Sequence, residues 1–351
     1  MATPLQVMSL ADMAAQQVAM SGCRPIVNKK LVKQYGSKAP VQLVTNRGVR
    51  VNSVLRKDEW EDLDRAIVPA AVQPLRLTGI IAARQNLVRP IASLGTLMAQ
   101  YNQVSEMTAA NISLRGHASG EKDLTDYSLV GVPVPIIFKE FELDQRVLLS
   151  SRMMGDGIDT SNAQAAARVV AEKVEDLWIN GDSSVNLNGN TIYGLTSHPN
   201  RNTDTATNYG GGDWGTQSNI EPTIAGMIAA AQADGYYGPY GVGVASTQYN
   251  QAALTTYSDG SGDTPLERIL RMPMVEFVEQ IPQLDAGEVV LFQLTSDVLE
   301  WRPVTGYSPI TTLEWASGDG MLGEFKVMAA GVPIIKSDHA GQSGVVHATG
   351  A

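Results

Sequence analysis

The chain contains a single cysteine, Cys23, among its 351 residues. No disulfide can therefore form within the chain, and a reducing compartment is the expected environment. No apolar run reaches the roughly 18 residues that a membrane-spanning helix needs, so no such helix is expected. The first residues also lack the basic region and apolar stretch of a secretory signal peptide, so secretion is not expected.

Charged residues are scarce in this chain. Asp, Glu, Lys and Arg make up 18% of it, against about 25% in typical soluble proteins. Hydrophobic residues make up 44%, which excludes disorder for most of the chain. Because the cores of protein–protein interfaces are depleted in Lys, Glu and Asp, this composition indicates that much of the surface is an interface.

The motifs of known catalytic and cofactor sites are also missing. There is no G-x-S-x-G nucleophile motif, and Gly210-Gly211-Gly212 lacks the Gly-Lys-Ser/Thr continuation of a phosphate-binding loop. The histidines have no second ligand at metal-binding spacing; they are His117, His198, His339 and His347. We therefore predict no catalytic residue, no cofactor and no metal, and interpret these histidines as surface or hydrogen-bonding residues.

One acidic loop is a candidate cation site. Asp259, Asp263 and Glu267 could place carboxylates around Ca²⁺, and the glycines between them permit a turn. Their spacing differs from that of a helix–loop–helix Ca²⁺ site. The favoured interpretation is a solvated loop that caps the following helix, with Asp263-Thr264 at the N-cap and Pro265 at the first helical position.

The first 57 residues are basic, whereas the rest of the chain is acidic. Nine Lys and Arg residues stand there against Asp12 alone, a net charge of +8, which leaves −18 for the remainder of a chain whose total is −10. The basic contacts that we predict are Arg24, Lys29, Lys30, Lys33, Lys38, Arg47 and Arg50. Such an arm can bind an acidic neighbour or make sequence-independent contacts with nucleic acid, and a solubilising tail is the alternative.

Several helices are predicted from apolar spacing and capping residues. Residues 9–21, 57–68 and about 75–86 are expected to be helical, and 24–53 extended. The strongest prediction is a helix over 160–180, about 30 Å long at 1.5 Å per residue. Its apolar stripe includes the predicted core residues Val170, Val174, Leu177 and Trp178.

Residues 96–115 and 126–148 are predicted to be two long extended arms of a hairpin with a polar tip. A two-stranded sheet is marginally stable in water, and its free edges favour pairing with another chain. The predicted interface residues at the tip are Arg115, His117, Glu121, Lys122 and Asp123. Salt bridges to an adjacent subunit are the favoured role of the tip, and a crosslinking Lys122 is the alternative.

Beyond residue 220 the pattern changes to short alternating helices and strands. Helices are expected near 221–234, 247–256 and 264–272, and strands near 241–246, 275–280 and 288–294. The final residues, 322–351, are expected to be strands that return to the first core.

Four segments together resemble a known family: DEWEDLDRAIV (58–68), LVGVPVPIIFKEFELDQRVLLSSR (129–152), IDTSNAQAAARVVAEKVEDLWINGD (158–182) and NTIYGLTSHPNRNT (190–203). They resemble the major capsid proteins of tailed double-stranded DNA bacteriophages, with the Hong Kong 97-type fold, and the related encapsulin shell proteins. The resemblance implies an α+β fold with an N-terminal arm, an extension loop, a peripheral domain with a spine helix, and an axial domain. The implied boundaries are arm 1–56, peripheral 57–89, extension loop 90–147, peripheral 148–219, axial 220–321 and peripheral 322–351.

The resemblance also implies a function. The chain would assemble with itself as pentamers and hexamers into an icosahedral phage capsid in the host cytoplasm, around double-stranded DNA held by non-specific contacts. Portal, scaffolding and decoration proteins are further candidate partners, and no membrane is expected. An encapsulin-type compartment around a cargo enzyme is the alternative, but the basic arm before residue 58 favours the viral shell. The absence of a long acidic or coiled-coil leader after Met1 argues against a fused scaffolding domain.

Overall fold

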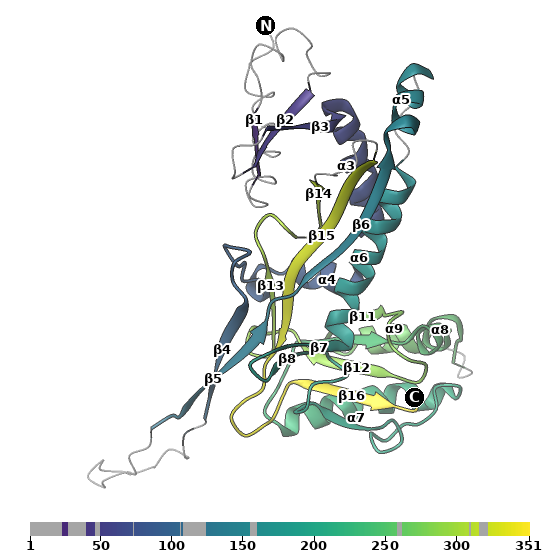
Figure 1. Cartoon of the computed structure of the whole chain (residues 1–351). Coiled ribbons are helices and arrows are strands. Elements are labelled where there is room, and N and C mark those ends of the chain that lie inside the picture. The colour runs from purple at the N-terminus through teal and green to yellow at the C-terminus, as the bar shows by residue number, and fades with distance from the viewer. Residues whose placement is uncertain are drawn as a thin grey trace, which may run out of the picture.

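The computed structural model describes most of the chain beyond the N-terminal segment. The described residues are 23–26, 40–45, 50–72, 74–105, 107, 124–154, 160–257, 262–308, 310–315 and 322–351. Figure 1 shows two sheets, one long and one short, with a hairpin projecting from the side of the body. One core cluster joins the long sheet to one face of the short sheet, through Val290, Phe292 and Val345, and a second cluster covers the other face of the short sheet.

The long sheet is built on β15 (Leu322–Ile335). Its antiparallel partners are β6 (Ile136–Asp144), β13 (Leu299–Pro303) and β14 (Thr311–Trp315). The strands β6 and β14 occupy opposite edges of β15, because both pair with the same part of it. Figure 1 shows the helix α6 (Ser161–Ile179) running along this sheet, with α3 (Lys57–Val72) beside it.

The spine helix α6 confirms the strongest prediction from sequence. All four predicted core residues, Val170, Val174, Leu177 and Trp178, are buried. The ring of Trp178 lies 5.7 Å from that of Trp301 on β13, so the stripe packs directly against the long sheet. Burying large aromatic side chains supplies much of a core's stability.

The helix α3 is longer than predicted, since it continues through Pro69 to Val72. A proline removes one backbone donor and usually ends a helix. Here the apolar face on both sides of Pro69 is buried, with Leu63, Ile67 and Ala71 in the core. Tertiary packing therefore overrides the local preference. After α3 come α4 (Arg76–Ala82) and the short η2 (Gln85–Leu87), in place of one predicted helix.

The second sheet has five strands in the order β11-β10-β12-β16-β9. The strands are β9 (Asn202–Thr205), β10 (Tyr240–Val244), β11 (Val275–Gln280), β12 (Val289–Gln293) and β16 (Val345–Thr349). Its helices are α7 (Ile220–Ala233), α8 (Ser246–Leu254) and α9 (Pro265–Leu270), and a short η3 (Gln217–Asn219) precedes α7. These elements agree closely with the helices and strands predicted beyond residue 220.

The membership of strands in the two sheets departs from the expected segment boundaries in three places. The C-terminal strand β16 joins the five-stranded sheet. The expectation that 322–351 returns to the first core holds for β15 and, within β16, for Val345, whereas Val346 and Ala348 pack in the second core. The strand β9, which precedes residue 220, also belongs to that sheet. Conversely, β13 and β14 lie in the long sheet, although both precede residue 321.

The hairpin consists of β4 (Met98–Val104) and β5 (Tyr127–Pro133), which form an antiparallel two-stranded sheet. The prediction of a single arm over 126–148 is wrong, because β5 ends at Pro133 and β6 then pairs with β15. Beyond β6, the helix α5 (Gln145–Met154) projects at the far end of the long sheet in Figure 1. A second small hairpin, β7 (Gly181–Leu187) and β8 (Asn190–Tyr193), follows α6.

The N-terminal segment contributes three antiparallel strands. They are β1 (Cys23–Ile26), β2 (Pro40–Thr45) and β3 (Arg50–Arg56). The prediction of extended structure is confirmed at these strands, while the helix predicted over 9–21 lies outside the described residues.

Candidate assembly surfaces

The inner face of the β4–β5 hairpin is docked on the body. Ala99, Tyr101 and Val132 are buried and pack with Ile192 of β8 and Ile334 of β15. Because side chains alternate across a strand, the neighbouring positions must lie on the opposite face. The hairpin therefore has one face in the core and one that is available to a partner.

The outer face of the hairpin is apolar and exposed. Val104 and Tyr127 are directly opposite each other in the ladder, and Leu129 is two residues further along β5. Their exposed fractions are 42%, 70% and 61%. Met107 and Leu124, beyond the strand ends towards the tip, are also exposed. Contiguous exposed apolar side chains mark interaction sites, and a lone two-stranded sheet gains stability from a partner.

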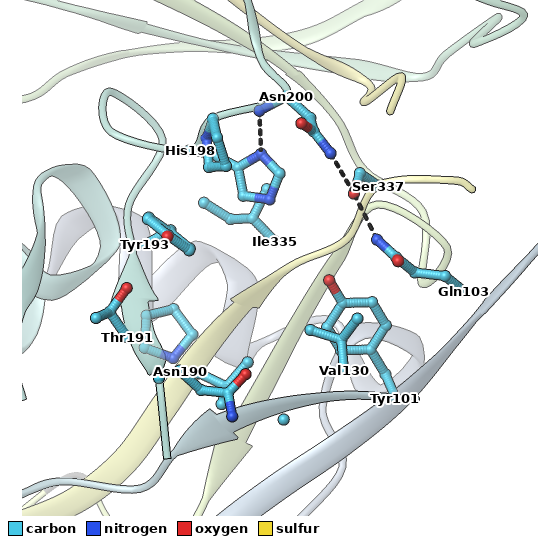
Figure 2. A pocket seen from close by; sticks show the side chains of 15 residues that line it. Tyr101, Gln103, Val130, Asn190, Thr191, Tyr193, His198, Asn200, Ile335 and Ser337 are labelled. Atoms are coloured by element: carbon cyan, nitrogen blue, oxygen red, sulfur yellow. Dashed lines mark hydrogen bonds between the residues drawn. The ribbon is translucent and has the colours of Figure 1, made fainter. Parts of the chain in front are cut away.

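A polar cluster joins the body to the end of β4 that leads to the tip. The Oγ of Ser337 accepts hydrogen bonds from Nε2 of Gln103 (2.8 Å) and Nδ2 of Asn200 (3.0 Å). The backbone N–H of Asn200 in turn donates to Nδ1 of His198 (3.2 Å). Figure 2 shows these groups around a pocket of about 170 Å³, with Tyr101 on the hairpin side and Tyr193 on the opposite side.

The serine of this cluster gives a first prediction. Replacing Ser337 with alanine should leave the amide donors of Gln103 and Asn200 without their shared acceptor. A buried group that loses its partner costs about 1–3 kcal/mol. We expect faster amide hydrogen exchange in β4 and β5, measured by mass spectrometry, and unchanged exchange in the five-stranded sheet.

The matched control is Ser184→Ala, because Ser184 is exposed on β7 and its hydroxyl donates to the nearby Asp182. Equal exchange of β4 and β5 in wild type and the Ser337 variant would show that Ser337 does not hold the hairpin.

The spine helix also holds α4 in place through a buried carboxylate. Glu175 is 1% exposed, and its oxygens accept hydrogen bonds from the backbone N–H groups of Leu77 (2.6 Å) and Thr78 (3.1 Å). The Thr78 hydroxyl adds a third bond, at 2.7 Å. Burial raises the pKa of Glu175, although these hydrogen bonds oppose the shift. The carboxylate supplies acceptors for the free donors at the start of α4.

Helix α5 presents a second exposed apolar surface. Val147, Leu149 and Met153 are exposed along it. The guanidinium of Arg152 bonds both oxygens of Glu59 on α3 at 2.6 Å, which fixes α5 to the body. A bidentate arginine–carboxylate pair is geometrically specific. The exposed side chains are thus held on a positioned helix at the end of the molecule opposite the hairpin (Figure 1).

A family model, described as a family of unknown function (DUF6260), matches residues 50–348. The chain belongs to this family. The match spans the arm strand β3, both sheets and the hairpin.

This DUF6260 chain is also similar to a curated protein. It is 23% identical over 198 residues to the type 1 encapsulin shell protein EncA of Myxococcus xanthus (strain DK1622). That alignment covers 56% of this chain and 63% of the relative, less than two thirds of the relative's length.

Solved structures of similar shape show the fold. A virus-like particle from Pyrococcus furiosus matches with a TM-score of 0.55 and 17% identity, over 82% of this chain and 98% of that one. The capsid of Myoviridae phage XM1 matches with a TM-score of 0.55 and 16% identity, over 76% and 90%. The predicted α+β fold of the Hong Kong 97 type is confirmed.

The predicted site residues of the DUF6260 chain fall into two groups. The spine-helix residues are in the core as expected, whereas the tip residues lie outside the described residues: Arg115, His117, Glu121, Lys122 and Asp123. Of the basic arm, Arg24 and Arg50 are in β1 and β3. The others lie outside the described residues: Lys29, Lys30, Lys33, Lys38 and Arg47.

The acidic loop of the DUF6260 chain holds its described carboxylates in other contacts. Thr264 caps α9 in a capping box with Glu267, and Pro265 follows at the first turn, as predicted. Asp263 accepts from both terminal nitrogens of Arg271, at 2.9 and 3.0 Å. Asp259 lies outside the described residues. Across the part of the chain that the structure describes, no three His, Cys, Asp or Glu residues are grouped as metal ligands.

Two histidines are more deeply placed than the sequence indicated. His198 and His347 are each 4% exposed, on either side of Arg201. The backbone oxygen of His198 accepts from Arg201, and Nδ1 of His347 lies 3.4 Å from Nε of Arg201. Burial, with the charge of Arg201 as a smaller cause, lowers the pKa of both histidines to about 4. The apolar run around His347 was the signal in the sequence that this residue is buried.

None of the helices in the described ranges is long and apolar enough to cross a lipid bilayer.

Proposed function

We propose that this DUF6260 protein is the major capsid protein of a tailed phage, which assembles with itself into an icosahedral shell around double-stranded DNA. The observation that carries the proposal is the hairpin of a Hong Kong 97-type fold, with one face docked in the core and an exposed apolar face of Val104, Tyr127 and Leu129. The proposal assigns the chain a structural role and not a catalytic one.

The arrangement of the surfaces supports assembly into rings. The exposed apolar residues of the hairpin and of α5 lie at opposite ends of the molecule (Figure 1). Contacts between two different surfaces are heterologous, and they form closed rings when the rotation closes. Such rings are the pentamers and hexamers of the proposal. Several weak contacts on one subunit act together, because the first contact raises the effective concentration for the others.

The contents of the shell distinguish two versions of the proposal. The basic arm, with its net charge of +8, favours a viral shell, since its interlocking contacts would resist internal DNA pressure. The second version is an encapsulin-type compartment around a cargo enzyme, favoured by the similarity to EncA. In the first version the virion is assembled in the host bacterial cytoplasm, with portal, scaffolding and decoration proteins as further partners.

Cryo-electron microscopy of the purified native particle tests the proposal. Icosahedral shells with layered, DNA-like density are the expected result. Shells with discrete protein density would replace the phage version with the encapsulin version. A small discrete oligomer without any shell would overturn both.

A second prediction concerns the outer face of the hairpin. The double variant Tyr127→Asp with Leu129→Asp should fold but form no shells, because buried unpaired charge opposes docking. Size-exclusion chromatography with light scattering should find subunits or small rings. Deleting residues 1–55 or cutting the tip at 115–124 should have the same effect.

The control for this variant is Leu254→Asp, a matched change at an apolar residue that is 79% exposed on α8. Normal shells from the hairpin variant would show that this face is not an assembly surface.

A further inference from the structure

The long sheet has one face that no helix covers at its outer end. Phe141 and Phe325 stack at 5.4 Å on the face towards α6, and Val327 lies on the same face in the core. Ladder partners share a face, so the opposite face carries Glu142 with Glu324, Glu140 with Lys326, Phe138 with Met328 and Ile136 with Ala330.

This outer face is exposed along β6. Phe138 and Ile136 are 54% and 44% exposed, although both are large apolar side chains on a regular strand. Glu142 is exposed, and Glu324 is half-buried opposite it. On β15 the opposite residues Met328 and Ala330 are buried in a cluster with Tyr307 and Leu313, so the exposed apolar part of the face is its β6 edge. This apolar edge beside an acidic end is the composition of a docking surface for a chain that is both apolar and basic.

The acidic half places two like charges directly opposite each other. Glu142 and Glu324 are register partners, and such pairs destabilise a sheet. The next pair on this face is Lys326 with Glu140. The Nζ of Lys326 already contacts this pair's Glu140 Oε1, at 2.7 Å, and lies 4.4 Å from the centre of the Phe138 ring. A cation from another chain placed between Glu142 and Glu324 would remove the repulsion.

The basic N-terminal segment of this chain matches that requirement. It has a net charge of +8 over 57 residues, and apolar residues alternate with its lysines in sequence. The described strands of the segment pair with one another in a separate three-stranded sheet, and not with the strands of the long sheet. The acidic face repels nucleic acid, so a basic segment of protein fits it better than DNA.

We propose that the outer face of the long sheet, centred on Glu142, Glu324 and Phe138, is the docking surface for the basic N-terminal segment of a second copy of the chain. This inference rests on the proposed assembly into shells and names the surface that receives the arm. The positive charge of the arm then neutralises protein carboxylates at subunit contacts. Assembly is consequently weakened by salt, because exposed charge pairs are screened.

Cross-linking of isotope-mixed shells tests the proposal directly. Shells assembled from equal amounts of ¹⁴N and ¹⁵N subunits are treated with a carbodiimide, which joins a lysine amine to a carboxylate without a spacer. Mass spectrometry should find mixed-isotope peptide pairs that link Glu142 or Glu324 to Lys29, Lys30, Lys33 or Lys38. If the cross-linked peptides always carry the same isotope, the arm lies on its own subunit and the proposal is overturned. The proposal is also overturned if no cross-link joins these lysines to Glu142 or Glu324.

Charge exchange gives an independent readout. The variant Glu142→Lys with Glu324→Lys should fail to form shells or lose them at several-fold lower salt than wild type. Adding Lys29→Glu, Lys30→Glu and Lys33→Glu should restore part of that salt resistance. The control is Asp62→Lys with Asp297→Lys. Both aspartates are exposed elsewhere on the subunit, and this variant changes the net charge by the same amount as the Glu142 and Glu324 variant.

The two proposals fail in different ways. If the wild-type chain forms no shells, the proposed function is wrong. If wild-type shells form and the Glu142 and Glu324 variant assembles with unchanged salt resistance, the shell remains and the docking surface is wrong.

Discussion

Replacing Glu300 with glutamine is expected to lower the free energy of unfolding by about 3–5 kcal/mol, the range for breaking a buried ion pair. The Glu300 side chain is 0% exposed, on β13 of the long sheet. Its oxygens lie 2.7 Å from Nζ of Lys336 and 3.0 Å from Nε of Arg302. The variant would leave two largely buried cations without their counter-charge.

The pKa of Glu300 is shifted in the direction that this expectation requires. Burial raises the pKa, but the hydrogen bonds from Lys336 and Arg302 outweigh it and hold the pKa below its usual range. A carboxyl whose pKa is lower in the folded state stabilises the fold above its unfolded pKa of about 4.3. That contribution is lost as the pH falls through the folded pKa.

Urea denaturation of the subunit at pH 7 measures the effect of the Glu300 variant. Glu172→Gln is the control, since Glu172 pairs with Arg168 one turn away on the exposed side of α6, at 2.7 Å. Exposed pairs of this kind contribute about 0.3–0.5 kcal/mol. Similar losses in the two variants would mean that the Glu300 cluster is not an important source of stability.

Much of the fold follows from local patterns in the sequence. The stripe through Val170 and Val174 fixes which face of α6 is buried, because helical spacing determines the face without any knowledge of the partner. The capping of α9 at Thr264 is equally local, since its hydrogen-bond partner is three residues away. These features depend on a few neighbouring residues and were predicted correctly.

Strand partners depend on distant residues and were predicted less well. The segment at β16 is apolar, which indicates burial but does not say which sheet it enters. The division between β5 and β6 had a local signal, because Pro133 and Pro135 cannot donate to a ladder. The β-propensity of the flanking residues obscured that signal.

The contacts that position the assembly surfaces join residues far apart in the sequence. Gln103 and Ser337 are separated by 234 residues, and Glu175 and Leu77 by 98. Nothing in either local sequence identifies the other partner. The exposed face of the hairpin could be inferred as self-insufficient from the sequence, but its inner attachment could not, and the helix α5 was not predicted.

The second large prediction is a loss of stability in mild acid through His198 and His347. Burial and the nearby charge of Arg201 lower both pKa values to about 4, against about 6.5 in an unfolded chain. Glu288 Oε1 lies 3.4 Å from Nε2 of His347 and favours the charged imidazole, but burial outweighs it. Between these pH values the unfolded chain binds more protons than the folded one, so stability falls as the pH falls.

The size of this effect follows from the two shifts. At 1.36 kcal/mol for each pKa unit, each histidine should reduce stability by about 3 kcal/mol between pH 6.5 and pH 4. The double variant His198→Asn with His347→Asn removes both titrations. Asparagine keeps an acceptor at position 198, because an Asn side chain accepts from the N–H two residues on, here that of Asn200 (Figure 2).

The histidine effect is measured as the difference between wild type and the double variant in urea denaturation from pH 7.5 to pH 4. The carboxyl groups that contact neither histidine titrate in both proteins, including Glu175, whose raised pKa acts in the opposite direction, so their contributions cancel in the difference. We expect wild type to lose about 6 kcal/mol more than the variant over this range. The exposed His339 supplies the control, His339→Asn, which should follow wild type. Parallel curves for wild type and the double variant would mean that both imidazoles take up protons without opposing the fold, and that burial does not keep them neutral.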